Sequence, residues 1–375
     1  MKKVLYITSM PWGWIKQRPQ FIPEYLSKHI PVDVFYKKSN TQSGKVLINP
    51  VDCENDSLKI HSYRLIPFYA IPFLRRLPLN WINKLLLDFQ LPKFDDYDVI
   101  WYTSPLCYKL TSSKINNQTV VYDCMDDHLE FPDVKNDDYQ KSVILANENN
   151  ILQNSSVVIC SAQYLADKII SRSGIESSKV RIINNAIELP SIDKKVEIST
   201  QAESVIEFLK THDSMLYVGT IEKWFDFNTI LEVLNSFPDL HLVLLGPGKN
   251  NVIDHERIHY MGIIQHKELF SILDHSKALV MPFIVNELIR SVNPVKLYEY
   301  IYSGKPVIAP RYGESLKFEP FVQLYNNADE FKNIINSLPE LCQKINLKKC
   351  RDFVKDNTWE CRCTEIAEII NNYHG

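Results

Sequence analysis

The side chains with the clearest chemical potential stand in the segment 293–310, NPVKLYEYIYSGKPVIAP. Asn293 suits the N-cap of a helix, and Pro294 suits its first position. Lys296 then falls in the first helical turn, where the positive end of the helix dipole disfavours a cation, so this lysine requires an anionic partner. A bound diphosphate would supply one, and the free backbone N–H groups at the helix start would hold the same anion.

Glu299 lies three residues beyond Lys296, hence on the same side of the predicted helix and one turn deeper. A carboxylate at that depth can bind ribose hydroxyl groups. The alternative is an ordinary solvated ion pair between Lys296 and Glu299, of the kind found on many helices. The apolar neighbours of the pair and the strand-like KPVIAP that follows favour a binding site.

A second reactive group follows a strand-like run in the segment 120–128, VVYDCMDDH. Its carboxylates stand at the carboxyl end of the predicted strand, where ligands of parallel sheets bind. Asp126 and Asp127 are candidates for a general base that takes a proton from an attacking hydroxyl. Two alternatives stay open: a helix cap or turn, which is the commoner role for an acid at a strand end, and an Asp-x-Asp metal site.

The loop after the first predicted strand, PWGWIKQRPQF at 11–21, offers a glycine between two tryptophans and an arginine. Gly13 would let the backbone approach a ligand closely, and Arg18 could bind an anionic group. A tight turn packed by Trp12 and Trp14 is an equally good interpretation.

The elements that must position these side chains alternate between short β-branched strands and helices, in two series. The first series predicts strands at 4–7, 32–36, 99–102, 119–122, 157–160 and 180–183. The second predicts strands at 215–218, 242–245, 257–260, 278–281, 307–309 and 322–325. Helices are predicted between them, notably over 19–28 and 139–153. This alternation is typical of the α/β class with two parallel sheets.

The length of 375 residues suits two domains. The segment 190–205 is polar and lacks a core periodicity, so the sequence predicts domains over 1–195 and 196–357. The tail, 358–375, carries apolar residues at helical spacing and therefore needs a packing partner.

Composition excludes several classes of protein. Hydrophobic residues at 45% and charged residues at 23% indicate a globular chain. The 42 Lys and Arg against 45 Asp and Glu leave a net charge of -3, which lacks the basic field of a nucleic-acid binder. The eight cysteines show no paired CxxC spacing, so reduced thiols in a cytoplasm fit best. No stretch reaches the roughly 18 apolar residues of a membrane span.

Residues 63–94 mix aromatic and leucine side chains with Arg75, Arg76 and Lys84. Such a mixture can lie in a membrane interface, and peripheral attachment at the inner face of the cell membrane is our hypothesis for it. The alternative is an irregular subdomain that covers the first sheet, which the four prolines favour because they prevent a long amphipathic helix.

The run 281–310, MPFIVNELIRSVNPVKLYEYIYSGKPVIAP, resembles the nucleotide-sugar site of GT-B glycosyltransferases, especially bacterial ones similar to the teichuronic-acid and xanthan transferases. The resemblance covers the C-terminal half, through YVGTIEKWFDF (217–227), LVLLGPG (242–248) and YMGIIQHKEL (260–269). It is thinner in the N-terminal half, where it rests on PWGWIKQRPQF, VVYDCMDDH and VRIINNAIELP (180–190).

This resemblance implies two Rossmann-like domains whose parallel sheets face a central cleft, with the donor on the C-terminal domain and the acceptor on the N-terminal one. It also implies that the last helix crosses back to the N-terminal domain. Glu299 would hold the ribose and Lys296 the phosphates. The backbone at Gly262 and Ile263 would hold the base, and Gly219 and Lys223 would approach the diphosphate. From the residues themselves, we also expect Asn293 and Gly13 to contact the donor, and Arg18 and Trp14 the acceptor.

Two departures from the family pattern bear on the sugar. The position of the expected sugar-binding glutamate is Ser291, and the nearest carboxylate is Glu287. The position of a common arginine in the first C-terminal loop is Thr220, for which Arg290 or Lys223 could substitute.

The resemblance therefore implies a hexosyltransferase-like enzyme that moves a sugar from a nucleoside-diphosphate sugar, with UDP favoured, to a hydroxyl of a cell-surface polysaccharide or lipid-linked glycan. No cofactor and no metal are expected, because such enzymes manage the leaving diphosphate with helix ends and cations. Whether transfer inverts or retains configuration stays open. The alternatives are a nucleotide-sugar epimerase of the same fold and a non-catalytic partner that binds a sugar nucleotide or glycan.

Overall fold

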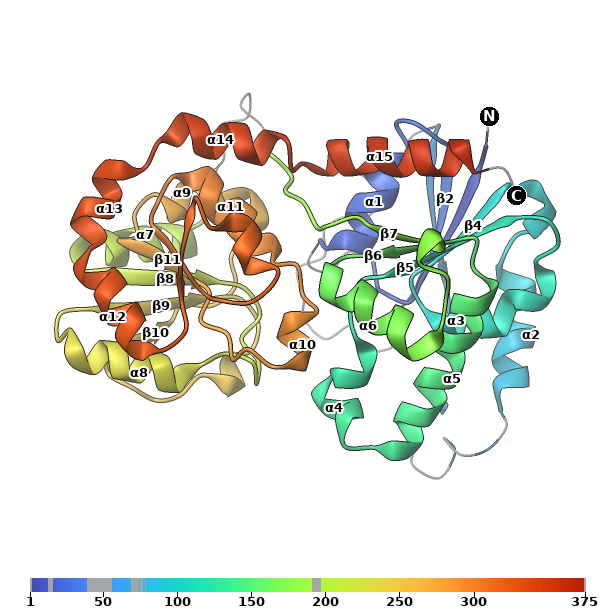
Figure 1. Ribbon diagram of the computed structural model, residues 1–375, viewed down its shortest axis with the longest axis horizontal. Helices are drawn as coiled ribbons and strands as arrows, with labels where there is room; N and C mark the ends of the chain where they lie inside the picture. Colours follow the sequence, from blue (N-terminus) through green and yellow to red (C-terminus); the bar gives the residue numbers. More distant parts are fainter. Residues whose placement is uncertain are drawn as a thin grey trace. The chain divides into compact units, whose positions relative to one another are not determined.

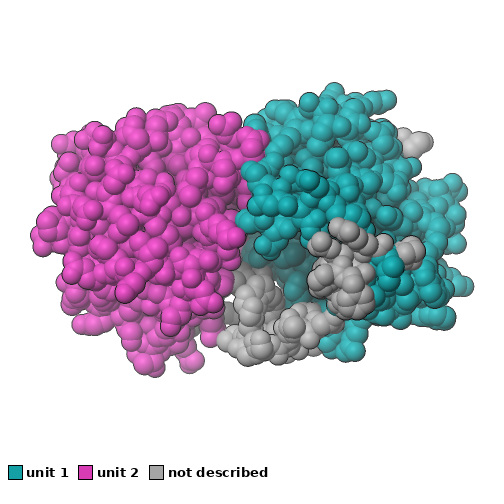
Figure 2. Space-filling view, turned by 90° about the horizontal axis from the view of Figure 1, so that it is seen from below, with its two compact units in different colours: residues 1–184, 359–375 teal, residues 185–358 magenta. Residues whose placement is uncertain are grey.

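The computed structural model describes residues 2–12, 16–38, 56–68, 74, 77, 79–190 and 197–373. The chain divides into two compact units, one of residues 1–184 with 359–375 and one of residues 185–358, coloured teal and magenta in Figure 2. The first boundary between the units, between residues 184 and 185, lies earlier in the chain than the predicted boundary between 195 and 196. The second lies one residue after the predicted boundary between 357 and 358.

Unit 1 is built on a seven-stranded sheet with the order β3-β2-β1-β4-β5-β6-β7, in which all neighbours are parallel. The strands are β1 (Val4–Thr8), β2 (Val32–Lys37), β3 (Leu58–Tyr63), β4 (Val99–Tyr102), β5 (Thr119–Cys124), β6 (Val157–Cys160) and β7 (Val180–Ile182). Strands β1, β4 and β6 are buried along their whole length, as parallel strands covered on both faces should be. Six of the seven strands were predicted, and β3 was not.

The helices of unit 1 come from both ends of the chain. They are α1 (Arg18–Leu26), α2 (Asn80–Gln90), α3 (Pro105–Thr111), α4 (Pro132–Lys135), α5 (Asp138–Asn154), α6 (Gln163–Ser173) and α15 (Trp359–Asn372). Phe21 of α1 stacks on Trp359 of α15 with ring centroids 5.0 Å apart, and Lys2 Nζ donates to the carbonyl of Ile370 at 2.6 Å. The last helix therefore packs on the first helix, beside which Figure 1 draws it.

Unit 2 has a six-stranded parallel sheet with the order β10-β9-β8-β11-β12-β13. Its strands are β8 (Ser214–Val218), β9 (His241–Leu245), β10 (Ile258–Tyr260), β11 (Ala278–Val280), β12 (Val307–Pro310) and β13 (Val322–Tyr325). Its helices are α7 (Thr200–Thr211), α8 (Phe227–Ser236), α9 (Leu269–Leu273), α10 (Glu287–Arg290), α11 (Val295–Ser303), α12 (Ala328–Asn336), α13 (Leu338–Lys344) and α14 (Leu347–Lys355). The predicted α/β class with two parallel sheets is confirmed.

The order of the second sheet creates a switch point. Strands β9 and β10 follow β8 on one side, while β11, β12 and β13 lie on the other side, so the chain reverses direction across the sheet between β8 and β11. Ligands of open α/β sheets bind beyond the carboxyl ends of the strands at such a point.

Glycines bring the loops at this edge of unit 2 into close contact. The backbone N–H of Gly219 after β8 donates to Leu245 at 2.8 Å, and that of Gly246 after β9 donates to Gly262 after β10 at 2.8 Å. Gly246 has φ 133°, and a Cβ there would lie 2.1 Å from the carbonyl oxygen of Gly219. Only glycine permits this backbone approach.

Candidate functional site

Helix α11 starts beyond β11 at the switch point of unit 2. It begins at Val295 with Pro294 as its N-cap, and no side chain caps it. The prediction that Asn293 caps this helix is wrong: its buried Oδ1 accepts no hydrogen bond from the described residues, while its Nδ2 donates to the buried Glu314 at 2.9 Å. The backbone carbonyl of Asn293 accepts from Asn185 Nδ2 at 2.8 Å.

Two residues fix the position of α11. The hydroxyl of Tyr300 accepts from the backbone N–H of Val218 at 2.8 Å, which joins the helix to the end of β8. Gly304 ends the helix in the left-handed conformation with φ 73°, which glycine adopts without strain. Tyr300 was not predicted to contribute, and its place in a helical apolar pattern gives no sign of this bond.

Glu299 is the buried centre of the candidate site. Only 3% of the residue is exposed, and its carboxylate accepts from His266 Nε2 at 2.8 Å and from Lys296 Nζ at 3.1 Å. Burial by itself raises the pKa of Glu299, but Lys296 and His266 outweigh it and lower the pKa to about 2. The carboxylate is therefore ionised at neutral pH.

The two hydrogen-bond donors to Glu299 are partly exposed to solvent. The side chain of Lys296 is 31% exposed and that of His266 is 39% exposed. Lys296 and Glu299 thus form an ion pair, as the alternative interpretation of the sequence expected. The pair is not an ordinary solvated one, however, because Glu299 is buried. We conclude that the pair is a partly open arrangement in which a polar ligand can contact Lys296, His266 and the carboxylate.

His266 belongs to the loop after β10 and was not predicted. It is the first residue of a short 3-10 helix, His266–Glu268, whose Glu268 accepts from the backbone N–H groups of Gln265 and Ser199 at 3.1 and 2.6 Å. These bonds hold the loop so that the imidazole faces Glu299. The Gln-x-x-Glu spacing of QHKE is a capping-box signal that could have identified the turn, though not the contact with Glu299.

The other residues predicted to bind the donor's base and phosphates lie in loops at the same edge of unit 2. Gly262 has φ 88°, and Ile263 beside it is exposed. Gly219 and Lys223 follow β8, and Lys223 is exposed. The sheet therefore collects these loops and the start of α11 at one end, although the contacts with a donor stay predictions.

Glu287 and Arg290, predicted to approach the sugar, form a separate exposed pair on α10. Arg290 Nη1 lies 3.9 Å from Glu287 Oε1. Ser291, which stands where the family has a glutamate, is buried and donates its hydroxyl to the carbonyl of Glu287 at 3.1 Å. Their roles in sugar binding stay predictions.

In unit 1, Asp127 is enclosed by its partners. It is fully buried, its Oδ1 accepts from the backbone N–H of Leu129 at 3.3 Å, and Lys168 Nζ and Arg172 Nη1 lie 2.9 and 3.1 Å from its carboxylate. Burial raises the pKa of Asp127, but the two cations outweigh burial and lower it. Asp127 is thus a helix cap and ion-pair centre, and a carboxylate with a lowered pKa is a weak base.

Asp126 has a different setting from its neighbour. It is half-buried, and its pKa is raised. Burial is the largest cause; His128 and Arg18 oppose it, while Asp123 and Asp127 add to it. A raised pKa strengthens a carboxylate as a base, so Asp126 is the better of the two candidates.

Arg18 is buried and committed to the interior of unit 1. Its Nε and Nη2 lie 2.9 and 2.8 Å from Asp123 Oδ1, and its Nη1 donates to the carbonyl of Ile183 at 2.8 Å. This setting argues against the predicted binding of an acceptor anion, because the guanidinium already neutralises a buried carboxylate. Gly13 and Trp14 lie outside the described residues.

Among the described residues, no group of three or more His, Cys, Asp and Glu side chains is placed to hold a metal ion. Within the same part of the chain, no helix combines the length and the apolar character needed to cross a membrane.

Comparison with known proteins gives one clear sequence relative. No protein-family model matches the chain. TuaH of Bacillus subtilis (strain 168), provisionally assigned as a teichuronic acid biosynthesis glycosyltransferase, is 22% identical over 290 residues, which cover 72% of this chain and 70% of the relative.

Solved structures resemble the whole chain. Alr3699/HepE of Anabaena, solved in complex with UDP and glucose, matches with a TM-score of 0.72 at 14% identity over 100% of both chains. Sucrose-phosphate synthase of Thermosynechococcus elongatus matches with a TM-score of 0.69 at 16% identity, over 99% of this chain and 98% of that chain. The relative confirms the predicted resemblance to the teichuronic-acid glycosyltransferases, and these structures confirm the predicted GT-B fold.

Proposed function

We propose that this GT-B glycosyltransferase takes a sugar from a UDP-sugar and transfers it to a hydroxyl of a cell-surface polysaccharide or a lipid-linked glycan. The observation that carries the proposal is the buried, ionised Glu299 of α11 between two partly exposed donors, Lys296 and His266. The sequence likeness to TuaH and the UDP complex of HepE support the acceptor class and the nucleotide, respectively.

The residues of unit 2 have complementary roles in donor binding. The carboxylate of Glu299 accepts hydrogen bonds from ribose hydroxyls, which replace one of its two present donors. Lys296 turns to the diphosphate, together with the free backbone N–H groups of the first turn of α11. The same cation and helix end stabilise the charge that develops on the leaving diphosphate.

For the acceptor hydroxyl, Asp126 supplies the base if configuration inverts. Its carboxylate would take the proton as the hydroxyl oxygen bonds to C1 of the sugar and the bond from C1 to the diphosphate oxygen breaks. This role rests on the raised pKa and partial exposure of Asp126. Retaining transfer needs no such base from unit 1.

Calorimetric titration with UDP, GDP, CDP and dTDP tests the donor site. We expect UDP to bind most tightly. Lys296→Ala and Glu299→Ala should each weaken UDP binding by about 10- to 100-fold, because each removes a charge-assisted hydrogen bond of about 1.5–3 kcal/mol. Lys332→Ala is the matched control: Lys332 pairs with Asp329 within α12 and should leave affinity unchanged. Unchanged UDP affinity in both site variants would reject the site.

Turnover separates this proposal from its alternatives. UDP release from UDP-sugars that rises when glycan acceptors are added indicates transfer. A change in the configuration of the sugar without any transfer to the acceptor would indicate an epimerase. Binding of the UDP-sugar without any turnover would indicate a non-catalytic partner.

A further inference from the structure

Helix α2 of unit 1 exposes large apolar side chains to solvent and buries a polar one. Its buried residues are Asn83 and Leu87, whereas Trp81, Leu85 and Phe89 are 60%, 49% and 89% exposed. These three side chains stand four residues apart and therefore form one stripe along the helix. Soluble proteins keep contiguous apolar surface small, so a stripe of this kind marks an interaction site.

The inner face of α2 explains why the apolar stripe is left outside. The side-chain amide of Asn83 both donates to and accepts from the backbone of Ile66, at 3.0 and 2.8 Å. Gln90 does the same with the backbone of Arg64, at 3.1 and 2.8 Å. The two amides thus bind the segment that leaves β3 in the manner of a neighbouring strand, which fixes the orientation of α2.

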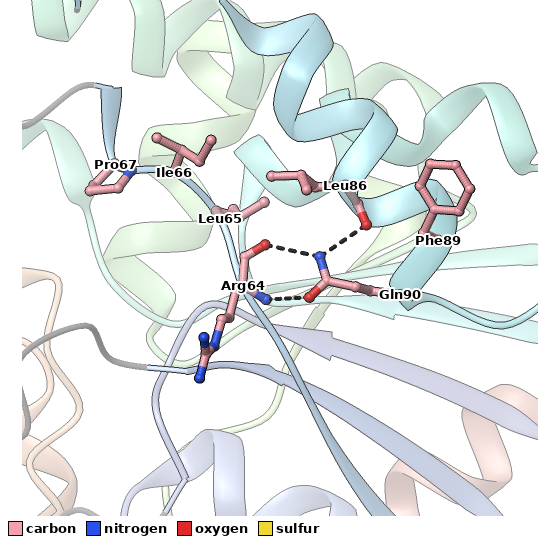
Figure 3. A pocket seen from close by; sticks show the side chains of 7 residues that line it. All are labelled: Arg64, Leu65, Ile66, Pro67, Leu86, Phe89 and Gln90. Atoms are coloured by element: carbon pink, nitrogen blue, oxygen red, sulfur yellow. Dashed lines mark hydrogen bonds between the residues drawn. The ribbon is translucent and has the colours of Figure 1, made fainter.

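An apolar groove lies beside the stripe, between α2 and the segment after β3. It measures about 400 Å³. Its lining residues are Arg64, Leu65, Ile66, Pro67, Leu86, Phe89 and Gln90. Figure 3 shows Leu65 and Ile66 on one side and Leu86 and Phe89 on the other, with Gln90 bridging to the backbone of Arg64. Because four hydrogen bonds hold its two sides, the groove is preformed.

The charges around the stripe are cationic. Lys84 and Asp88 are the charged residues of α2, and Asp88 is neutralised by Lys114 at 3.0 Å. Lys84 and Arg64 are exposed, and neither has an ion-pair partner among the described residues. Although the whole chain carries a net charge of -3, this face attracts anions.

We propose that the stripe Trp81, Leu85 and Phe89 and its adjoining groove dock the protein on an anionic lipid bilayer. The three side chains enter the boundary between headgroups and acyl chains, an acyl chain segment occupies the groove, and Lys84 and Arg64 contact lipid phosphates. The size of the patch favours a bilayer over a second protein. The eight residue steps from Trp81 to Phe89 span only about 12 Å of helix, which is short for a stable protein interface of about 800 Å² on each partner.

Vesicle flotation of the full chain without any donor tests this proposal. We expect flotation with vesicles of mixed phosphatidylglycerol and phosphatidylcholine and weaker flotation with phosphatidylcholine alone. Phe89→Ser and Trp81→Ser should each lower the partition coefficient about tenfold, because each removes an inserted aromatic side chain. Lys84→Gln should lower it by about fivefold on the anionic vesicles only.

Leu316→Ser is the matched control, since Leu316 is an exposed leucine of unit 2 at 44% and should have no effect. Thermal unfolding verifies that each variant remains folded, which is expected because the replaced side chains lie on the surface. Equal flotation of Phe89→Ser and wild type, or no flotation of wild type, overturns the proposal. So does a wild-type dimer in sedimentation velocity that Phe89→Ser dissociates, which would assign the stripe to a second copy of the chain. Because no nucleotide is present, these outcomes are independent of the donor site.

Discussion

The two units place carboxylates at the carboxyl ends of similar parallel sheets, but they surround them differently. In unit 2, Glu299 is buried while its partners Lys296 and His266 are partly exposed. In unit 1, Asp127 is enclosed by a backbone N–H group, Lys168 and Arg172, and Arg172 also pairs with the buried Glu148.

This difference separates binding from structural roles. A ligand can replace one donor of Glu299 because both donors have exposed surface. The carboxylate of Asp127 is itself fully buried, and three donors share it: the backbone N–H of Leu129, Lys168 at 26% exposure and Arg172 at 16% exposure. The neighbouring Asp126 combines partial exposure with a raised pKa, which indicates that the structure tolerates an unfavourable charge there. A charge that lowers the stability of the fold in this way is typical of functional positions.

The largest expected effect concerns Asp126. If it is the base, Asp126→Asn should lower kcat by about 10²- to 10⁴-fold, because general base catalysis contributes that much. Since burial raises the pKa of Asp126, the ionised form is destabilising at neutral pH, so the same variant should also have a higher unfolding free energy. UDP release with alkyl glycosides as acceptors and urea unfolding measure the two effects. An unchanged kcat with retained configuration would remove Asp126 from the mechanism.

The next effect is structural and concerns Asp127. Asp127→Ala should lower the unfolding free energy by roughly 3–5 kcal/mol, because it leaves Lys168 and Arg172 without their shared carboxylate and removes a helix cap. Urea unfolding measures the loss, with the exposed Asp133→Ala as control. A variant as stable as wild type but inactive would restore Asp127 as the catalytic candidate.

A smaller effect concerns the contribution of Glu299 to the unfolding free energy, which should depend on pH. Its pKa of about 2 lies below the ordinary value of 4.5, so its stabilising contribution is present above pH 4.5 and is lost as the pH falls toward 2. The full contribution is about 3 kcal/mol, of which about 2 kcal/mol disappears between pH 5 and pH 3. Unfolding free energies of wild type and Glu299→Gln should therefore converge by that amount. Parallel pH curves would show that the pKa of Glu299 is not lowered.

Most of the architecture could be predicted because parallel strands buried on both faces are short β-branched runs between helices. β3 was missed because Leu58–Tyr63 alternates apolar with exposed polar residues at the edge of the sheet, where burial is incomplete. Errors of this kind are expected wherever one face of a strand meets solvent.

The candidate site was predictable only in its local part. Lys296 and Glu299 could be paired because helical spacing places residues three apart on one side. The capping of α11 was predicted wrongly: Asn293 Oδ1 accepts no bond from the helix, and the contact made by its Nδ2, with the buried Glu314, comes from 21 residues further along the chain. His266 was missed because 33 residues separate it from Glu299.

The sequence by itself determined the alternation of strands and helices, the positive N-terminal turn of α11 and the presence of Glu299 behind Lys296, since all three depend on interactions within a few residues. Only the tertiary structure decided which charges are satisfied. It enclosed Asp127 and Arg18, left Lys296 and His266 accessible and turned the apolar stripe of α2 outward. The reason is physical: burial and long-range hydrogen bonds set the pKa and the accessibility of a charged group, and both arise only when distant segments pack together.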